Sequence, residues 1–356
     1  MKPPMKQKIF FIVSSLTMGG SERVFWLLAQ GFDKEKYDVS IVLLNSKNSF
    51  FSLDLENIRV IDLETIKSSR SFFKLYKLLN DEKPYAVYST SGHINILVAF
   101  LSLFIQIPKL VARESNIPNE MLLHEGFKAK FWSHFVKLFY KRFKTIVCQS
   151  EEMKHSLHSF YKISPIKLVV IPNPVLISKA TEVPSRLRLA KNIIIIARLS
   201  IVKGHERLLD IFSKLPENYI LTIAGDGEIR ERILDKIRSL NLDSRVIFLG
   251  QVSDITEIIP NYDAVVLSSY TEGFPNVILE SLSMGVPVIT FRVGGITGLI
   301  KDGFNGYILE QDDHNGFAKQ IIETCNRSWD HEAIRRHVYE THSLEKIVTR
   351  YEALIA

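Results

Sequence analysis

Short apolar segments alternate with longer helical segments along almost the whole chain, and this alternation limits the possible fold more than any other feature. In the first half, strands are expected at residues 8–15, 37–44, 58–63, 86–89, 109–113, 145–149 and 167–171. In the second half, strands are expected at residues 192–197, 219–224, 245–249, 263–268, 287–291 and 306–309. Near-continuous apolar strands separated by helices indicate parallel sheets with both faces covered. The alternation therefore predicts an α/β protein with doubly wound sheets.

The alternation stops once, at Pro172-Asn173-Pro174. Two prolines in three residues disfavour both a helix and a strand ladder at this point. The chain has 356 residues, more than the ~250–300 at which one hydrophobic core usually stops growing. We therefore predict two Rossmann-like domains, residues 1–173 and 174–339, that face each other across a cleft. Ligands should bind in the loops that follow the strands, and residues 312–356 should be helical throughout, with Ser343 capping the last helix.

The net charge of +6 is concentrated in the first half of the chain. Residues 1–175 hold 24 Lys and Arg against 15 Asp and Glu, whereas the rest holds 21 against 24. This asymmetry points to an anionic partner for the first half, such as a membrane surface, a phosphate-bearing acceptor or nucleic acid. The chain has no zinc-finger spacing, RNP-like segment or arginine-rich tail, so we expect no nucleic-acid partner. Two distant cysteines, Cys148 and Cys325, indicate a reduced cytosolic protein without disulfides.

We expect no secretory signal and no transmembrane segment. The longest apolar run, residues 94–107, is shorter than the ~20 residues of a spanning helix and better suits a buried helix. In residues 121–144, lysines and an arginine are interleaved with aromatic residues, and residues 69–79 repeat the pattern. This composition suits a helix lying on anionic lipid, although the aromatic residues could instead pack on the sheet. The expected location is cytoplasmic, peripheral at the inner face of the cytoplasmic membrane.

The segment from Glu272 to Glu280 places one carboxylate in a Gly/Pro loop and a second on the helix that follows. Pro275 is predicted at the first helical position, which puts Asn276 and Glu280 on one helix face. The start of a helix has unpaired N–H groups and a partial positive charge, and therefore suits a phosphate. The alternative is a surface loop whose acidic residues are simply solvated.

Three further loops follow expected strands. Arg198 and Lys203 could converge on a diphosphate without a metal, or they could form a solvated basic loop. The pair Gly19-Gly20 would let backbone approach a ligand, or could serve only a tight turn, since the dinucleotide fingerprint is absent. Gly225 begins a Gly-Asp-Gly turn typical of a strand-to-helix connection.

Taken together, these motifs resemble those of the retaining glycosyltransferases of family 4, which have the two-domain GT-B fold. The resemblance is carried by Arg198 with Lys203, Gly225-Asp226-Gly227, Gly250-Gln251-Val252, the Glu-x7-Glu segment from Glu272 to Glu280, and Gly285-Val286-Pro287-Val288. Gly19-Gly20-Ser21-Glu22-Arg23 resembles the N-terminal loop of the same family. The resemblance spans nearly the whole chain and is thin between residues 49 and 167.

The resemblance implies a nucleoside-diphosphate sugar held mainly by the second domain, with the acceptor bound by the first. It assigns Arg198 and Lys203 to the diphosphate, Glu272 to the donor sugar, Glu280 to the ribose, Val252 to the vicinity of the base, and backbone near Phe274, Pro275 and Asn276 to the sugar or distal phosphate. It also places Gly19, Gly20 and Gly225 at the donor. No metal or other cofactor is implied, and the last helix, about residues 340–356, can pack back on the first domain.

His93 corresponds to a cleft histidine that the family often has near the donor sugar, and Gly92 would permit close approach. The alternative is a histidine that caps a helix. Where many relatives have Glu-His-Asn, this chain has Glu114-Ser115-Asn116. Ser115 therefore stands in place of that histidine and cannot perform a role that requires its imidazole ring.

The predicted function is retaining transfer of a hexose or N-acetylhexosamine to a cell-surface polysaccharide, lipopolysaccharide or lipid-linked glycan. The alternatives are a GT-B sugar-nucleotide epimerase and a catalytically silent, membrane-associated GT-B scaffold. A hydrolase with two catalytic carboxylates would leave Arg198 and Lys203 without a role. The sequence leaves the donor base, sugar, acceptor, linkage and oligomeric state open.

Overall fold

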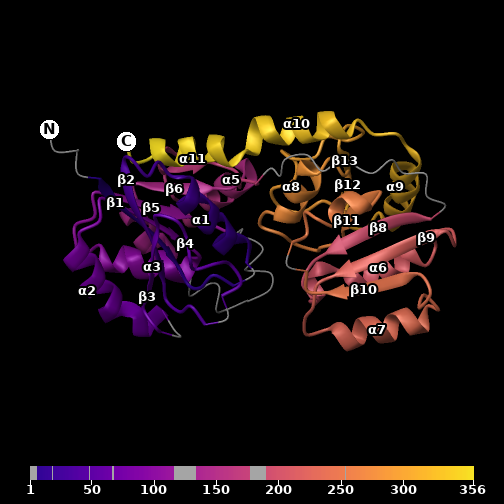
Figure 1. Cartoon of the computed structure of the whole chain (residues 1–356), viewed down its shortest axis with the longest axis horizontal. Helices are drawn as coiled ribbons and strands as arrows, with labels where there is room; N and C mark the ends of the chain where they lie inside the picture. Colours follow the sequence, from indigo (N-terminus) through magenta and orange to yellow (C-terminus); the bar gives the residue numbers. More distant parts are fainter. Residues whose placement is uncertain are drawn as a thin grey trace. The chain divides into compact units, whose positions relative to one another are not determined.

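The chain divides into two compact units, each built on one parallel sheet (Figure 1). The computed structural model describes residues 6–17, 19–47, 49–65, 68–115, 134–176, 190–252 and 254–356. Unit 1 comprises Met1–Pro174 and Leu344–Ala356, and unit 2 comprises Val175–Ser343. Every pair of neighbouring strands in both sheets is parallel. The predicted α/β class, with two doubly wound parallel sheets, is confirmed.

The sheet of unit 1 has the strand order β3-β2-β1-β4-β5-β6-β7. Its strands are β1 (Gln7–Val13), β2 (Tyr37–Leu43), β3 (Arg59–Asp62), β4 (Ala86–Thr90), β5 (Lys109–Arg113), β6 (Thr145–Cys148) and β7 (Leu168–Val170). Alternate side chains of a strand point to opposite faces. Ile9 and Phe11 of β1 pack with α1 (Gly20–Gly31) and α11 (Leu344–Ala353), while Phe10 and Ile12 pack with α2 (Phe72–Glu82), α3 (Gly92–Leu101) and α5 (Glu151–Tyr161). Both faces of this sheet are therefore covered.

The C-terminal helix α11 is part of the core of unit 1. The Tyr351 side chain is fully buried, and its backbone carbonyl accepts a 2.7 Å hydrogen bond from the Tyr88 hydroxyl. The Glu352 carboxylate accepts from the backbone N–H of Asp33 at 2.8 Å. Chain segments more than 250 residues apart in sequence thus share one core.

The sheet of unit 2 has the order β10-β9-β8-β11-β12-β13. Its strands are β8 (Lys191–Ile196), β9 (Tyr219–Ala224), β10 (Val246–Gly250), β11 (Ala264–Leu267), β12 (Val288–Phe291) and β13 (Gly306–Leu309). Ile193 and Ile195 of β8 pack with α6 (His205–Phe212), α7 (Arg230–Ser239) and α9 (His314–Asn326), whereas Ile194 packs with α8 (Asn276–Ser283) and α10 (His331–His342). Short 3-10 helices are η1 (Ser68–Ser71), η2 (Tyr140–Arg142), η3 (Pro165–Lys167), η4 (Ile201–Lys203) and η5 (Ile259–Asn261).

The C-terminal region is less continuous than predicted. Residues 327–330 separate α9 from α10, and the Asp330 side chain caps α10 by accepting from the backbone N–H of Ala333 at 2.9 Å. An aspartate at this position offers the backbone an N-cap, which ends the preceding irregular segment. Ser343 alone stands between α10 and α11. The prediction of uninterrupted helix from residue 312 is therefore wrong.

The order of strands reverses between β1 and β4 in unit 1 and between β8 and β11 in unit 2. In open α/β sheets, ligands bind beyond the carboxyl ends of the strands at such a reversal. The loop after β1 ends at Gly19, and Gly20 begins the next helix; His93 lies at the start of the helix that follows β4. Lys203 follows β8 and Glu272 follows β11. In the described part of the chain, no helix is long and apolar enough to cross a membrane.

Candidate active site

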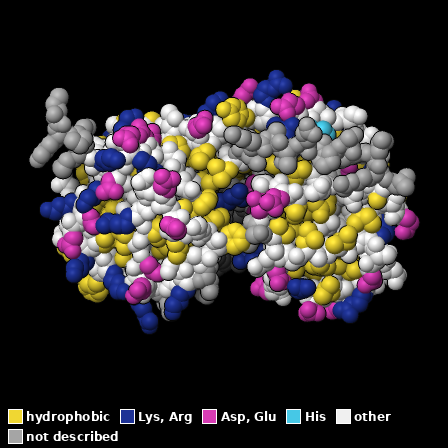
Figure 2. Space-filling view, in the orientation of Figure 1, with side chains coloured by type: hydrophobic (Ala, Val, Ile, Leu, Met, Phe, Trp, Pro, Cys, Tyr) yellow, Lys and Arg dark blue, Asp and Glu magenta, His cyan; other side chains and the backbone are white. Residues whose placement is uncertain are grey.

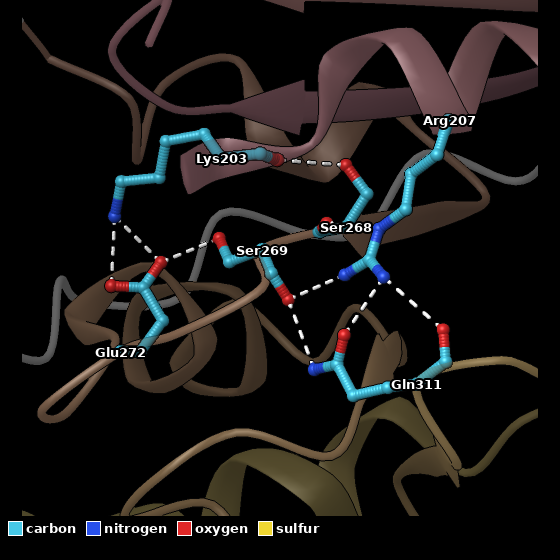
Figure 3. A network of polar contacts seen from close by, with 6 residues as sticks. All are labelled: Lys203, Arg207, Ser268, Ser269, Glu272 and Gln311. Carbon is cyan, nitrogen blue, oxygen red and sulfur yellow. Dashed lines mark hydrogen bonds and ion pairs between the residues drawn. The ribbon is translucent and has the colours of Figure 1, made fainter. Parts of the chain in front are cut away.

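Lys203 and Glu272 form an ion pair at the strand reversal of unit 2 (Figure 3). The Lys203 Nζ atom lies 2.6 Å from Glu272 Oε1 and 2.7 Å from Oε2. The Ser269 hydroxyl donates to Oε1 at 2.6 Å, which is the third hydrogen bond to this carboxylate. Only 22% of the Lys203 side chain and 11% of the Glu272 side chain are exposed. The structure thus brings together two residues that lie 69 positions apart in the sequence, and the Lys203 ammonium is already paired with the Glu272 carboxylate.

The two loops that carry this pair are bonded to each other through their backbones. Gly204 has φ of +65°, and a Cβ atom added there would lie 2.0 Å from the carbonyl oxygen of Ser268. Only glycine permits that approach. The Ser268 hydroxyl donates to the Lys203 carbonyl at 3.0 Å, and the Tyr270 N–H donates to the Val202 carbonyl at 2.8 Å. The end of β8 and the end of β11 are therefore held together before any ligand binds.

Arg198, on the same loop as Lys203, is exposed. Its guanidinium makes no hydrogen bond or ion pair with any residue that the structure describes. The surrounding backbone is nevertheless fixed, because the Leu199 N–H donates to the Asp226 carbonyl at 3.0 Å. Gly225 has φ of +139°, and a Cβ atom there would fall 2.0 Å from the Ala197 carbonyl oxygen. Gly225 therefore serves to pack the turn after β9 against the loop that presents Arg198.

Pro275 precedes the helix it was predicted to begin. It is the N-cap of α8, with φ of −80° and ψ of 101°, and the helix starts at Asn276. The extended ψ excludes Pro275 from the helix, and a proline loses no hydrogen bond at either position. Asn276 and Glu280 do share a helix, as predicted, but Glu280 is only 4% exposed. Val252 and Phe274 are partly buried against the core of the same sheet face.

In unit 1 the glycine pair begins helix α1, with Gly19 as N-cap and Gly20 as the first residue. The carboxylate of Glu22 lies against Gly19, since a Cβ atom on Gly19 would fall 2.1 Å from Glu22 Oε2. Burial raises the pKa of Glu22, while its own backbone N–H and the positive charge of Arg113 act in the opposite direction. An acidic side chain thus lies at the helix start where the glycine pair was predicted to let backbone approach a ligand.

His93 lies in the first turn of α3, after the N-cap Ser91. The residue is exposed, although partial burial of its ring lowers its pKa. Arg113 and Glu114, by contrast, are buried. Arg113 donates to Asn173 Oδ1 at 2.6 Å, and the Tyr140 hydroxyl donates to Glu114 at 2.5 Å. These two charged residues form part of an internal polar network, and Asn116 lies outside the described residues.

Sequence reasoning missed Arg207, which is 5% exposed and bonds the loop of Ser268 and Ser269. One signal was available. Arg207 stands four positions before Ile211 on the apolar face of helix α6, where a solvated arginine is out of place.

Comparison with known proteins agrees with this architecture. Residues 18–179 match the family described as Glycosyltransferase Family 4, and residues 184–340 match Glycosyl transferases group 1. One similar protein is the Campylobacter jejuni GalNAc-alpha-(1->4)-GalNAc-alpha-(1->3)-diNAcBac-PP-undecaprenol alpha-1,4-N-acetyl-D-galactosaminyltransferase, 29% identical over 90% of this chain and 89% of that protein. Another is the Escherichia coli UDP-Gal:alpha-D-GlcNAc-diphosphoundecaprenol alpha-1,3-galactosyltransferase, 26% identical over 90% and 88%.

Solved structures share the fold. Anabaena HepE in complex with UDP-glucose superposes with a TM-score of 0.83 at 19% identity, covering 98% of this chain and 99% of that one. The lipopolysaccharide outer core galactosyltransferase WaaB in its apo form gives a TM-score of 0.78 at 20% identity with the same coverage. The chain therefore belongs to the family 4-like glycosyltransferases and is a hexosyltransferase of the GT-B fold.

Proposed function

We propose that this protein transfers a hexose or N-acetylhexosamine from a nucleoside-diphosphate sugar to a cell-surface polysaccharide, lipopolysaccharide or lipid-linked glycan, with retention of anomeric configuration. Unit 2 binds the donor and unit 1 the acceptor. The observation that carries the proposal is the Lys203–Glu272 pair, together with Arg198 on the same loop as Lys203, whose guanidinium has no partner among the described residues. The named relatives that act on undecaprenol-diphosphate glycans, and the UDP-glucose bound by HepE, support the substrate classes.

The charges of the two loops suit a departing diphosphate. Arg198 can bind the donor without breaking an existing contact, because its guanidinium bonds no residue that the structure describes. Lys203 then exchanges the Glu272 carboxylate for a phosphate oxygen, which frees Glu272 to face the donor sugar. Positive charge grows at the anomeric carbon and negative charge on the diphosphate in the transition state, so a carboxylate and two cations act where charge develops. No metal is needed in this scheme, and unchanged transfer in EDTA would agree with it.

The bonding changes balance within the donor and acceptor. The bond from the anomeric carbon to the diphosphate oxygen breaks, and the acceptor oxygen forms its bond on the same face of the sugar. The acceptor proton passes to the leaving phosphate oxygen. The other predicted contacts stay predictions. They are Glu280 with the ribose, Val252 near the base, backbone around Asn276 with the sugar or distal phosphate, and His93 in the cleft.

A thermal-shift screen of nucleoside-diphosphate sugars tests the donor class, because a ligand at 100 times its Kd adds ~2.7 kcal/mol of stability. The stabilising donor is then incubated with and without lipid-linked glycan acceptors, and the products are analysed. We expect transfer only with an acceptor. A changed free sugar nucleotide in the absence of acceptor would establish the epimerase instead, and no turnover across the whole panel would favour the silent scaffold.

We also propose that unit 1 contacts an anionic membrane through an exposed aromatic surface. This surface consists of Phe72, Phe73, Phe100, Leu103, Phe104, Leu138 and Phe139. Phe73, Phe104 and Leu138 are 80%, 61% and 62% exposed. The Phe100 ring centroid lies 5.7 Å from that of Phe72, 5.5 Å from that of Phe104 and 5.7 Å from that of Phe139, so three separate segments form one apolar surface.

Basic residues lie in the same segments as this surface. They are Lys74 and Lys77 on α2, Lys137 two residues before Phe139, and Lys141 and Arg142 in η2. Figure 2 shows Lys and Arg side chains projecting where Figure 1 places α2, with hydrophobic atoms between them. Exposed aromatic residues with flanking cations suit the headgroup region of anionic lipid. The earlier alternative holds in part, because Tyr140 and Phe143 are buried in the core. Residues 121–133 of the predicted segment lie outside the described residues.

Vesicle pelleting tests this surface. The wild-type protein should pellet with phosphatidylcholine vesicles only when phosphatidylglycerol is included, and raised salt should release it. Phe73→Ser with Phe104→Ser should weaken pelleting. Ile247→Ser with Leu249→Ser is the matched control, because these residues of β10 in unit 2 are 49% and 42% exposed. Equal pelleting with and without phosphatidylglycerol would contradict the proposal.

A further inference from the structure

Arg207 donates four hydrogen bonds, to Ser268, Ser269 and Gln311, at the base of the Glu272 loop (Figure 3). Its Nε donates to the Ser268 carbonyl at 2.7 Å and its Nη2 to the Ser269 carbonyl at 2.6 Å. Its Nη1 donates to the side-chain and backbone oxygens of Gln311 at 2.8 Å and 3.2 Å. The planar guanidinium fork therefore holds two consecutive carbonyls of one loop and a residue that follows β13.

Both faces of the guanidinium are also occupied. Its central carbon lies 3.9 Å from the ring centroid of Tyr270 and 4.0 Å from that of Phe291. No Asp or Glu of the described chain pairs with Arg207, so neutral carbonyl dipoles and aromatic faces alone compensate its charge. Burial lowers its pKa to about 10, and the group stays charged at neutral pH. A buried cation held in this way requires a specific geometry, since one displaced acceptor leaves it unsatisfied.

The bonds of Arg207 lead directly to the proposed catalytic pair. Ser269, whose carbonyl Arg207 holds, donates through its hydroxyl to Glu272 Oε1. Ser268, whose carbonyl Arg207 also holds, donates through its hydroxyl to the Lys203 carbonyl. Gln311 supports the same loop by donating to the carbonyls of Ser269 and Tyr270, each at 3.3 Å. One buried arginine is thus linked to each member of the ion pair through a single intervening serine, and it makes no hydrogen bond to either member.

We propose that Arg207 is a positioning residue whose guanidinium fork fixes the loop of residues 268–272, so that Glu272 and Lys203 stay aligned for the donor. This inference rests on the proposed roles of Glu272 and Lys203. Arg207 touches no reacting atom in it. A lysine could keep the charge, but one ammonium cannot reproduce the fork that spans two carbonyls and Gln311.

Unit 2 offers a matched control in Arg245. Arg245 is 6% exposed, stacks 4.7 Å from the Phe212 ring centroid, and donates to the carbonyls of Tyr219, Leu215 and Pro216 at 3.1, 3.1 and 2.8 Å. It lies at the amino end of β9, away from the loops that carry the ion pair. Loss of Arg245 removes a similar set of contacts without disturbing residues 268–272.

The test compares Arg207→Met, Arg207→Lys, Arg245→Met and Glu272→Gln with the wild type, using the donor from the screen. Melting temperature should fall in Arg207→Met and Arg245→Met. Only Arg207→Met should also lose kcat, by about 100-fold, because a displacement of about 1 Å can cost that much. KM for the donor should change less than kcat, and Arg207→Lys should recover little. A crystal structure of Arg207→Met should show the Lys203–Glu272 contact lengthened.

Each contrary outcome has a distinct meaning. If Arg207→Met keeps the kcat of Arg245→Met while Glu272→Gln loses activity, the inference is wrong and the proposed function stands. Full recovery in Arg207→Lys would also overturn it, since charge alone would then suffice. Wild-type turnover in Glu272→Gln would instead overturn the proposed function. Should Arg207→Met fail to fold, Gln311→Ala serves in its place, with an expected loss in kcat of about tenfold; unchanged kcat there would refute the positioning role.

Discussion

Lys203 donates to both carboxylate oxygens of Glu272, at 2.6 and 2.7 Å, from a loop 69 residues earlier in the chain. The residue expected to bind the donor diphosphate is thus already paired with the residue expected to face the donor sugar. We expect donor binding to replace this contact, so the two side chains should act as a unit.

Removing either partner should abolish most of the transfer activity. Lys203→Ala removes a cation that contacts the leaving group, and Glu272→Ala removes a carboxylate near the sugar. Each substitution should therefore lower kcat/KM by about 10²–10³-fold. The double variant should lose less than the product of the two effects, because the residues share one network. Kinetics at saturating acceptor, with circular dichroism to confirm folding, measures this. Wild-type turnover in either single variant would remove the assignment.

Arg198→Ala should weaken donor binding without changing stability. Arg198 is exposed and bonds no described residue, so its loss should alter the free energy of unfolding by less than about 0.5 kcal/mol. A lost charge-assisted contact with a diphosphate should weaken UDP binding by about 10- to 100-fold. Isothermal titration calorimetry with UDP measures the affinity. Arg238→Ala is the control, since that α7 arginine is exposed and, among the described residues, its side chain pairs only with Asp235; equal UDP affinity in the two variants would contradict the prediction.

Tyr351→Ala should strongly destabilise unit 1. The side chain is fully buried between α11 and the sheet, with its ring centroid 5.9 Å from that of Tyr88. Truncating a large buried aromatic residue to alanine costs about 3–5 kcal/mol. Chemical denaturation should show the loss. Tyr339→Ala, at a 50% exposed position of α10, should cost little, and a similar cost at both positions would argue against a core role for α11.

His205 should make stability fall in mild acid. It is 1% exposed, and neither ring nitrogen has a hydrogen-bond partner within the described chain. Burial, helped by the charge of Lys203, lowers the pKa of His205 to about 4. His205 of the unfolded chain binds a proton below about pH 6.5, whereas His205 of the folded chain binds one only below about pH 4. The contribution of neutral His205 to stability is therefore complete above about pH 6.5 and decreases as the pH falls from there to about 4.

From these values His205 should cost about 2 kcal/mol of unfolding free energy between pH 7 and pH 5. Denaturation curves of His205→Leu should lack this part of the acid dependence. His155→Leu, on the exposed side of α5, should keep it. An identical pH dependence in wild type and His205→Leu would exclude the effect.

The alternation of short apolar and longer helical segments predicted the fold class and most of the strands. The expected strands at residues 109–113, 219–224 and 306–309 are found with the same bounds as β5, β9 and β13. Strands of this kind are encoded locally, because a short apolar segment between turn residues must be buried on both faces. The position of the candidate site also followed, since parallel strands place the loops after them at one edge of the sheet. The start of helix α8 was predicted one residue too early, at Pro275, because the φ of a proline fits both the N-cap and the first helical turn.

Which charged groups are paired, buried or exposed depends on contacts that form only in the folded chain. Arg198 and Lys203 look alike in sequence, yet one is exposed without a described partner and the other is bound to Glu272. Glu280 and Arg207 are charged residues that the fold places in its interior, and α11 joins a core built from the other end of the chain. Pairing and desolvation depend on contacts between segments far apart in sequence, and the free energy of a charge depends on its surroundings rather than on its neighbours along the chain.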